Sequence, residues 1–278
     1  MRRAHTEGRW RILAGLLGLV VAASGCKSLG TADQSSGDED SWLLDGGLIV
    51  QSRPLTGKVI GHSDGDTIDV AVEGSRERTR VRLSNIDTPE KARRRTPELG
   101  QDPWATEASD QMKALAPLGT TVVLRPVGGM SFRRMIAAVA IDGQDLGISM
   151  VRTGWALPLI FCRPSTNCAK ANLTSMGAQA LIEACVEAEN AGLGVFSRER
   201  PLPELPYEFR DRAWGMREIV WVADYATERF YDFDKRNEVP ACRQIVFALE
   251  DTNGRAEGMP PDSTRGSPVG SGYTRPQL

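Results

Sequence analysis

The sequence predicts an α+β protein, and two periodic patterns carry this prediction. Apolar residues alternate with polar ones at Ile68, Val70 and Val72. The same alternation returns at Val81 and Leu83. A period of two is typical of a strand with one buried face, whereas later stretches repeat every three or four residues, as an amphipathic helix does. The chain is therefore expected to combine short strands with helices.

Composition limits the classes of function. The chain has 278 residues, 41% hydrophobic and 25% charged, which is enough for one or two globular domains. Its net charge is −2 at pH 7, which excludes an overall basic protein. A nucleic-acid partner would have to be held by a local patch or through a metal ion.

Residues 1–26 have the character of an export signal. A basic start leads into an apolar run at residues 12–23, which is short for a permanent membrane helix. The run ends in ASGC, which is similar to the attachment box of bacterial lipoproteins, so we expect Cys26 to be lipidated. Lys27, which is not acidic, directly follows Cys26, and this favours the outer membrane of the cell envelope. The alternative is an ordinary cleaved signal with an incidental cysteine.

Four further segments follow from composition. Residues 27–53 are rich in Ser, Gly and Asp, cannot bury a core, and are interpreted as a flexible tether. Residues 54–199 are expected to form the main domain. After a Pro-rich linker, residues 200–262 are predicted to be a small accessory subdomain without a metal-ligand set. Residues 263–278 are expected to be a disordered tail.

The elements of these segments are predicted from periodicity and from residues that end helices. Gly192 is expected to follow the last helix of the main domain in the left-handed conformation. The predicted strands are residues 55–60, two segments around Val70 and Val81, and residues 120–124, 131–141, 221–225 and 244–249. The predicted helices are residues 105–116, 145–152 and 174–191.

Carboxylates stand at the ends of the two central strands. Asp66 enters the first strand, whereas Asp87 and Glu90 follow the second. If the strands pair antiparallel, these ends meet, and the acids beside Arg82 would repel one another unless a cation lay there. Oxygen ligands without nearby His or Cys favour Ca²⁺ or Mg²⁺. The alternative interpretation is a polar hairpin end with solvated acids.

The two pieces together have a specific spacing. The sequence DGDT at residues 64–67 is followed by RLSNIDTPE at residues 82–90. This pattern resembles the thermonuclease family, whose members have the staphylococcal-nuclease-like fold. The resemblance implies a Ca²⁺ site and catalytic residues of a phosphodiesterase. The implied calcium ligands are Asp66, Asp87 and the carbonyl of Thr88, and the implied catalytic residues include Arg82 and Glu90.

A second catalytic arginine is expected from the family motif Asp-x-Tyr-Gly-Arg. Counting back from the turn at Asp142 places it on Arg134. The Asp, Tyr and Gly of the motif are absent, and Arg133 takes the position of the glycine. A shift of one residue would make Arg133 the catalytic arginine, so both remain open. Ile160 stands where the family often has another phosphate-contacting Tyr, which indicates altered substrate contacts.

The resemblance covers about residues 55–198. Together with the predicted elements it implies a five-stranded OB-type barrel with three helices, a fold that binds oligonucleotides on an exposed face. The loop at residues 91–97 carries four cations and corresponds to a mobile loop beside the family's site. These cations either meet a phosphodiester backbone or are a solvated run of charge.

Four cysteines remain after Cys26, and an even number in an exported chain favours disulfides. Four cysteines allow three connectivities. Cys162 and Cys168 bracket a short, turn-rich loop, so we favour a bond between them and a second bond between Cys185 and Cys242.

Together with the resemblance, these observations predict a Ca²⁺-dependent phosphodiesterase that cleaves DNA and RNA, preferably single-stranded or frayed. The resemblance further implies products with 3′-phosphate ends. The membrane would be met through the lipid anchor only, and no protein partner is implied. One alternative is a nuclease-fold module that binds nucleic acid without cutting it, but such modules lose their acids, and here Asp66, Asp87 and Glu90 are all present. A structural envelope lipoprotein would not explain the spaced site.

Overall fold

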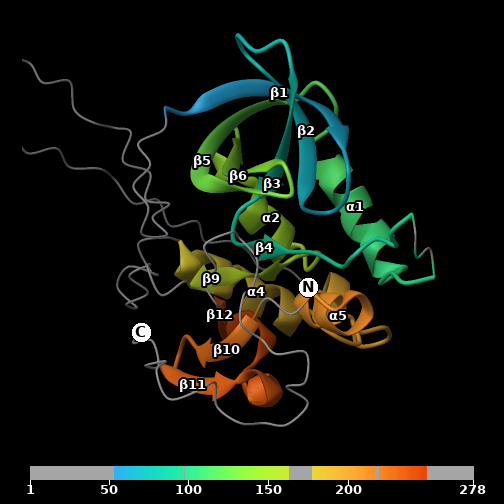
Figure 1. Ribbon diagram of the computed structural model, residues 1–278, viewed down its shortest axis with the longest axis vertical. Helices are drawn as coiled ribbons and strands as arrows, with labels where there is room; N and C mark the ends of the chain where they lie inside the picture. The colour runs from blue at the N-terminus through green and yellow to red at the C-terminus, as the bar shows by residue number, and fades with distance from the viewer. Residues whose placement is uncertain (1–52, 95, 97, 163–176, 217–218, 249–278) are drawn as a thin grey trace, which may run out of the picture. The chain divides into compact units, whose positions relative to one another are not determined.

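The computed structural model describes residues 53–94, 96, 98–162, 177–216 and 219–248 (Figure 1). The predicted export signal with Cys26, nearly all of the tether, the loop cysteine Cys168 and the C-terminal tail lie outside the described residues. None of the described helices is both long and apolar enough to cross a membrane.

Five strands close into a barrel: β1 (Leu55–His62), β2 (Thr67–Val72), β3 (Arg78–Leu83), β5 (Thr121–Ser131) and β6 (Arg134–Ile141). Antiparallel neighbours follow the order β3-β2-β1-β5-β6, and a parallel pairing of β3 with β6 closes the ring. A closed barrel leaves no free sheet edges, which suits such short strands. The predicted five-stranded barrel is therefore confirmed.

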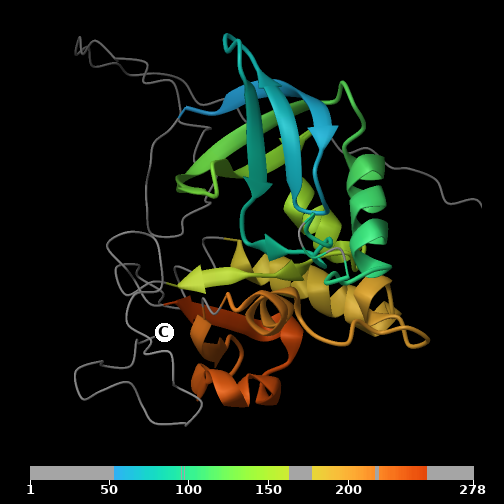
Figure 2. The ribbon, with the colours of Figure 1, turned by 45° about the vertical axis from the view of Figure 1, so that its right-hand side comes forward.

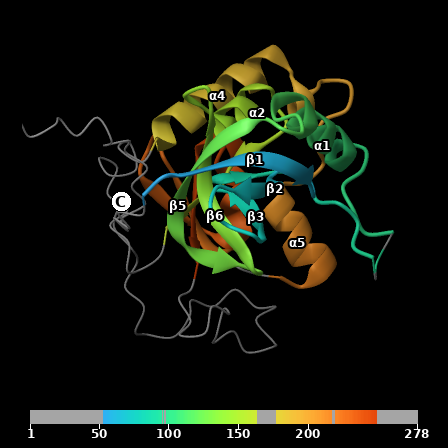
Figure 3. The same ribbon diagram turned by 90° about the horizontal axis from the view of Figure 1, so that it is seen from above.

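Three helices of the described residues accompany the barrel, where the sequence predicts helices. They are α1 (Trp104–Leu115), α2 (Leu146–Arg152) and α4 (Ala178–Ala191). Figure 2 shows α1 lying along the side of the barrel strands, and Figure 3 shows α1, α2 and α4 on one side of them. Asp145 caps α2 by accepting the backbone N–H of Ile148, and the left-handed Gly192 follows α4.

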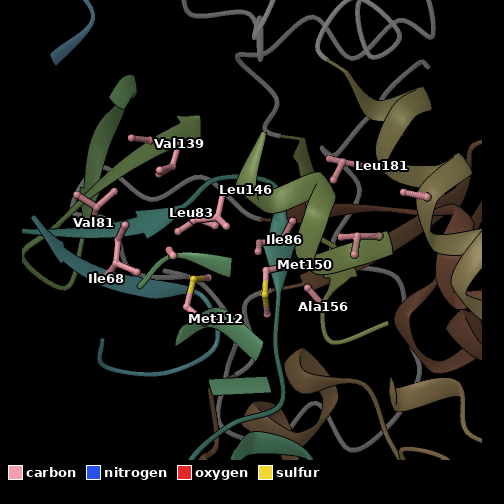
Figure 4. Packing of buried hydrophobic residues seen from close by; sticks show 14 of the residues in the cluster. Ile68, Val81, Leu83, Ile86, Met112, Val139, Leu146, Met150, Ala156 and Leu181 are labelled. Carbon is pink, nitrogen blue, oxygen red and sulfur yellow. The ribbon is translucent and has the colours of Figure 1, made fainter. Parts of the chain in front are cut away.

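The core lies between the barrel and the helices (Figure 4). Alternate strand residues such as Ile68 and Val81 point inward and meet Met112 from α1 and Met150 from α2, all of them fully buried. This arrangement explains both periodicities, because period two places every second strand residue inside and the helical spacing gives one apolar face. The core fixes the positions of the strand ends that carry the polar residues.

Two short strand pairings complete the described part of the main domain. β4 (Ile86–Asp87) pairs antiparallel with β8 (Leu157–Pro158), and β7 (Gln144–Asp145) extends the sheet next to β6. The 3-10 turn η1 (Gly194–Phe196) follows α4. The pairing of Asp87 with Leu157 anchors the backbone of a predicted site residue.

One strand prediction is corrected. Residues 131–141 are not a single strand, because β5 continues to Ser131, a turn occupies Phe132 and Arg133, and β6 begins at Arg134. Both turn residues have positive φ angles, 49° and 64°. A two-residue hairpin turn requires this backbone, and its usual sequence mark, Asn or Gly, is missing here.

The C-terminal segment adds elements that the sequence pattern did not indicate. They are α5 (Pro206–Trp214), where Pro206 starts a helix after the Pro-rich linker, and β11 (Arg229–Asp232). The predicted strands appear as β10 (Ile219–Asp224) and β12 (Gln244–Ala248). Two 3-10 turns are also present, η2 (Phe233–Glu238) and η3 (Ala241–Arg243).

The C-terminal strands share a sheet with the main domain. The order is β11-β10-β12-β9, and β9 (Ile160–Cys162) lies parallel to β12. The predicted disulfide between Cys185 on α4 and Cys242 on η3 is confirmed. The C-terminal segment is thus joined to the main domain both by backbone pairing and by a covalent bond.

Candidate active site

The two central strands bring the predicted acids together. β2 and β3 are antiparallel, with Thr67 opposite Arg82, so Asp66 at the start of β2 lies beside the end of β3. The backbone N–H of Leu83 donates to the carbonyl of Asp66 at 2.9 Å. Asp87 follows one tight turn later in β4. The expectation that these strand ends meet is confirmed.

Arg82 links the two carboxylates. Its Nη2 lies 3.2 Å from Oδ2 of Asp66 and 3.1 Å from Oδ1 of Asp87. Its Nη1 donates to the carbonyls of Leu83 and Ile86, at 2.8 and 2.9 Å. One guanidinium therefore holds the turn between β3 and β4 and neutralises two acids, which suits its planar fork of donors.

The carboxylates of Asp66 and Asp87 are buried, so water screens their interactions with Arg82 only weakly. The side chains of Asp66 and Asp87 are only 9% and 2% exposed. Burial alone would raise the pKa of Asp66, but attraction to Arg82 and the hydrogen bond from Thr67 outweigh it, so the pKa lies below its usual value. Asp66 is therefore held as a carboxylate.

Gly65 lies between Asp64 and Asp66, and its φ angle is not positive, so it is not needed there for a left-handed backbone. A Cβ at this position would lie 3.0 Å from Ala108 of α1 and from the side chain of Thr88. The glycine allows the loop before β2 to pack against α1 and against the buried Thr88, which keeps the two halves of the motif together.

Glu90 lies on the loop after β4 and is the most open of the three acids, with 25% of its side chain exposed. Its Oε1 accepts a hydrogen bond of 2.6 Å from Nη1 of Arg210, which also donates to Oδ1 of Asp87 at 2.9 Å. Burial, with further help from Asp87 and Asp66, raises the pKa of Glu90 to about 7, although Arg210 acts in the opposite direction.

Arg134 faces the same cluster from β6. Its Nη1 donates to Oγ1 of Thr67 at 3.1 Å, and its other donors bind Ser131. Arg133 is exposed in the left-handed turn. Of the two arginines that the sequence leaves open, the structure places Arg134 beside Asp66 and its neighbour Thr67.

Three contributors were missed by the sequence argument. Arg210 is buried and comes from α5, and no local pattern marks it. Gln101 is also buried, and its Oε1 accepts the backbone N–H of Glu90 at 3.0 Å. Asp64 was passed over within DGDT, although its Oδ1 accepts the backbone N–H of Asp66; burial, and then repulsion by Asp66, raise its pKa to about 7.

The cations of the loop after Glu90 are partly engaged within the protein. Nζ of Lys91 donates to the carbonyl of Ser63 at 3.0 Å. The guanidinium of Arg93 lies 3.5 Å from the ring centre of Trp214, at the end of α5. Arg95 lies outside the described residues. Part of the predicted run of charge therefore joins the loop to its surroundings.

The donor set fits a hard cation. Among the described residues no group of three His, Cys, Asp or Glu side chains could hold a metal by itself, but the predicted set needs only two carboxylates and the Thr88 carbonyl. Oxygens of Asp66 and Asp87 already converge on one nitrogen of Arg82. Oδ2 of Asp87 is buried and accepts no hydrogen bond within the described structure. Such oxygen-only donors suit Ca²⁺.

Comparison with known proteins adds a family and several relatives. Residues 80–183 match the sequence model of a family described as "Staphylococcal nuclease homologue". Endonuclease YhcR of Bacillus subtilis is 27% identical over 195 residues, which make up 66% of this chain and 15% of that protein.

Three further relatives match shorter stretches of the chain. An uncharacterized lipoprotein of Mycoplasma genitalium is 32% identical over 108 residues, 34% of this chain and 42% of its own length. Two Escherichia coli proteins, each named uncharacterized endonuclease, are 40% and 39% identical over 103 residues, 37% of this chain and 60% of theirs. The chain thus covers less than two thirds of each of these relatives.

Proposed function

We propose that the protein, whose residues 80–183 match the family of staphylococcal nuclease homologues, is a Ca²⁺-dependent phosphodiesterase that cleaves DNA and RNA. The observation that carries the proposal is the convergence of Asp66, Asp87 and Glu90 around the guanidinium groups of Arg82 and Arg210. Relatives named endonuclease support the same class of reaction.

The cation would be held by Asp66, Asp87 and the carbonyl of Thr88. When bound, Ca²⁺ supplies positive charge that polarises a phosphoryl oxygen. The two carboxylates are prepared for this role because Arg82 keeps them side by side and the core fixes the strand ends that carry them.

Glu90 would accept a proton from the attacking water. Its carboxylate is more exposed than those of Asp66 and Asp87, so solvent reaches it. As the water oxygen bonds to phosphorus, its proton passes to Glu90. The bond from phosphorus to the 5′-oxygen then breaks, the 5′-oxygen takes a proton from solvent, and a 3′-phosphate end remains.

Arg82 and Arg134 would stabilise the charge that grows on the phosphate. Both reach the cluster from the barrel, from β3 and β6, and the planar guanidinium fork matches two phosphate oxygens at once. Electrostatic stabilisation of the transition state by preorganised donors of this kind is usually the largest single contribution to a rate enhancement. Phe132 and Ile160 lack the hydroxyl groups that the family's tyrosines offer, so the arginines would carry more of the phosphate contacts here.

We place the enzyme at the cell envelope, anchored through Cys26. The support is the export signal with its ASGC box, together with a relative that is named a lipoprotein.

Digestion of nucleic acid tests the function. The full-length protein, purified in detergent, is mixed with DNA or RNA in Ca²⁺ or in chelator. We expect cleavage in Ca²⁺ only, with 3′-phosphate ends that become extendable after phosphatase treatment. Cleavage that persists in chelator would contradict the calcium mechanism. Binding without cleavage in Ca²⁺ would instead support a module that binds nucleic acid without cutting it.

A further inference from the structure

Arg210 links the C-terminal segment to the acids of the site. It lies on α5, 120 residues beyond Glu90, and its side chain is only 10% exposed. A single nitrogen, Nη1, donates to Asp87 at 2.9 Å and to Glu90 at 2.6 Å. The arginine therefore bridges a proposed calcium ligand and the proposed proton acceptor.

A second connection reaches the backbone of the same glutamate. Gln101 accepts the N–H of Glu90 through Oε1 at 3.0 Å, and its own backbone N–H donates to the carbonyl of Glu90 at 2.8 Å. The amide group of Gln101 also donates to the carbonyl of Glu204, just before α5, at 2.9 Å. Side chain and backbone of Glu90 are thus both tied to the region around α5.

Helix α5 is itself firmly held. The hydroxyl of Tyr207 donates to Gln244 of β12 at 2.6 Å in the buried interior, and Glu208 forms an ion pair with Arg236. At its other end Trp214 stacks with Arg93 from the loop after Glu90. The arginine therefore projects from a rigid element, which is what a precise contact to a catalytic group requires.

A buried ion pair adds little net stability, because the loss of hydration offsets much of the attraction between the charges. Stability alone therefore does not explain why Arg210 is buried against these acids. A positional reason fits better. Glu90 stands on a loop, close to two other acids, and without a partner its carboxylate would turn away from Asp87 or move onto a cation bound there. Groups that orient ligands and bases in this way typically change affinity or activity 10- to 100-fold when removed.

We propose that Arg210 is a positioning residue of the nuclease site, which holds the Glu90 carboxylate as a proton acceptor and keeps it from becoming a further ligand of the cation. The inference rests on the function proposed above. It predicts opposite effects on two quantities. Loss of Arg210 lowers kcat, because Glu90 is no longer fixed, and strengthens Ca²⁺ binding, because a positive charge leaves Asp87 and a carboxylate becomes free.

The test uses full-length protein in detergent. Arg210→Gln and Arg210→Met are two neutral variants of similar size, so that one serves if the other does not fold. Arg210→Lys keeps a positive charge at this position. Arg212→Gln is the matched control, since Arg212 lies on the same helix, is 60% exposed and pairs with Glu204. For each, kcat and KM on DNA, the Ca²⁺ dissociation constant by calorimetry without DNA, and the thermal midpoint are measured.

We expect the neutral variants to lose about 10- to 100-fold in kcat with little change in KM, and to bind Ca²⁺ several-fold more tightly. Arg210→Lys should recover much of both, and Arg212→Gln should match wild type. Neutral variants with wild-type kcat would overturn the proposal, and faster ones would show that Arg210 inhibits. Falls in kcat, Ca²⁺ affinity and thermal midpoint together would mean a structural role only. Wild-type protein that does not cut DNA would instead refute the proposed function, and this inference with it.

Discussion

The barrel and the C-terminal segment supply arginines to the same acids by different routes. Arg82 is five residues from Asp87, and strand register alone carries it to the cluster. Arg210 is 123 residues from Asp87 and arrives only because α5, the shared sheet and the disulfide place it there. The site thus has a local part, whose residues lie close together in the sequence of the barrel, and a long-range part that depends on the packing of α5 against the barrel domain.

This difference separates what each part should do when it is disturbed. Changes in the barrel's own arginines should act on the chemical step without any help from the C-terminal segment. Changes in the disulfide and contacts that hold the C-terminal segment should mainly lower the free energy of unfolding. They should lower activity only where they displace Arg210.

The first concerns the arginine supplied by β6. Arg134→Ala should lower turnover by about 10²–10³, because a preorganised charge near the reacting phosphate is lost. Arg133→Ala, the neighbouring control, should mainly weaken DNA binding and reduce its salt dependence. Steady-state cleavage and binding at several salt concentrations distinguish the two. An exchange of the two phenotypes would show that Arg133 carries the catalytic role.

The disulfide tests the long-range part. Cys185 and Cys242 are 57 residues apart, and a crosslink over such a span typically contributes about 2–5 kcal/mol. The double change of Cys185→Ser and Cys242→Ser should lower the free energy of unfolding in urea by this amount. A protein as stable as wild type would contradict the view that the bond holds the C-terminal segment in place.

Gly65 tests the packing of the local part. Gly65→Ala introduces a methyl group 3.0 Å from both Thr88 and Ala108, and should cost about 1–3 kcal/mol of stability. Gly74→Ala is the control, since no atom lies within 4 Å and only its φ of 77° opposes the change. Urea unfolding of both variants, together with Ca²⁺ affinity, checks this. A Gly65→Ala protein with unchanged stability and Ca²⁺ affinity would refute the packing role.

An exposed pair provides the smallest effect. Arg200 and Glu107 connect the C-terminal segment to α1, with side chains 49% and 35% exposed. A double-mutant cycle with Arg200→Ala and Glu107→Ala should give a coupling of only about 0.2–1 kcal/mol, and less at high salt, because water screens the charges. A larger coupling would mean that this contact, too, fixes the two regions together.

The same division explains what could be predicted from sequence. The barrel, the three described helices near it and the meeting of Asp66 with Asp87 follow from periodicity, from short-range pairing and from a motif whose second half lies within the residues that match the family model. The disulfide between Cys185 and Cys242 also followed, from cysteine number and spacing.

The remaining features depend on contacts that sequence patterns do not contain. Helix α5 begins at Pro206, the last residue of a Pro-rich stretch that we interpret from sequence as a linker. In the sequence nothing distinguishes the buried Arg210 from an arginine on the surface. Phe132 and Arg133 have positive φ angles, but neither is the glycine or asparagine that would predict such a turn from sequence. At this turn tertiary packing decided the conformation against the local preference. Helix α5, in contrast, has local start signals, since Pro206 is its first residue and Glu208 accepts the backbone N–H of Leu205.

Cleavage and binding by Glu90→Gln test the central claim most directly. The full-length variant and wild type are compared in Ca²⁺ for single-turnover cleavage of labelled DNA and for DNA affinity, with the exposed Glu189→Gln as control. The account predicts nearly unchanged affinity and a fall in cleavage rate of at least about 10²–10³ for Glu90→Gln, because the proton acceptor is lost. A Glu90→Gln protein that cleaves as fast as wild type would contradict the assignment of this cluster as the active site.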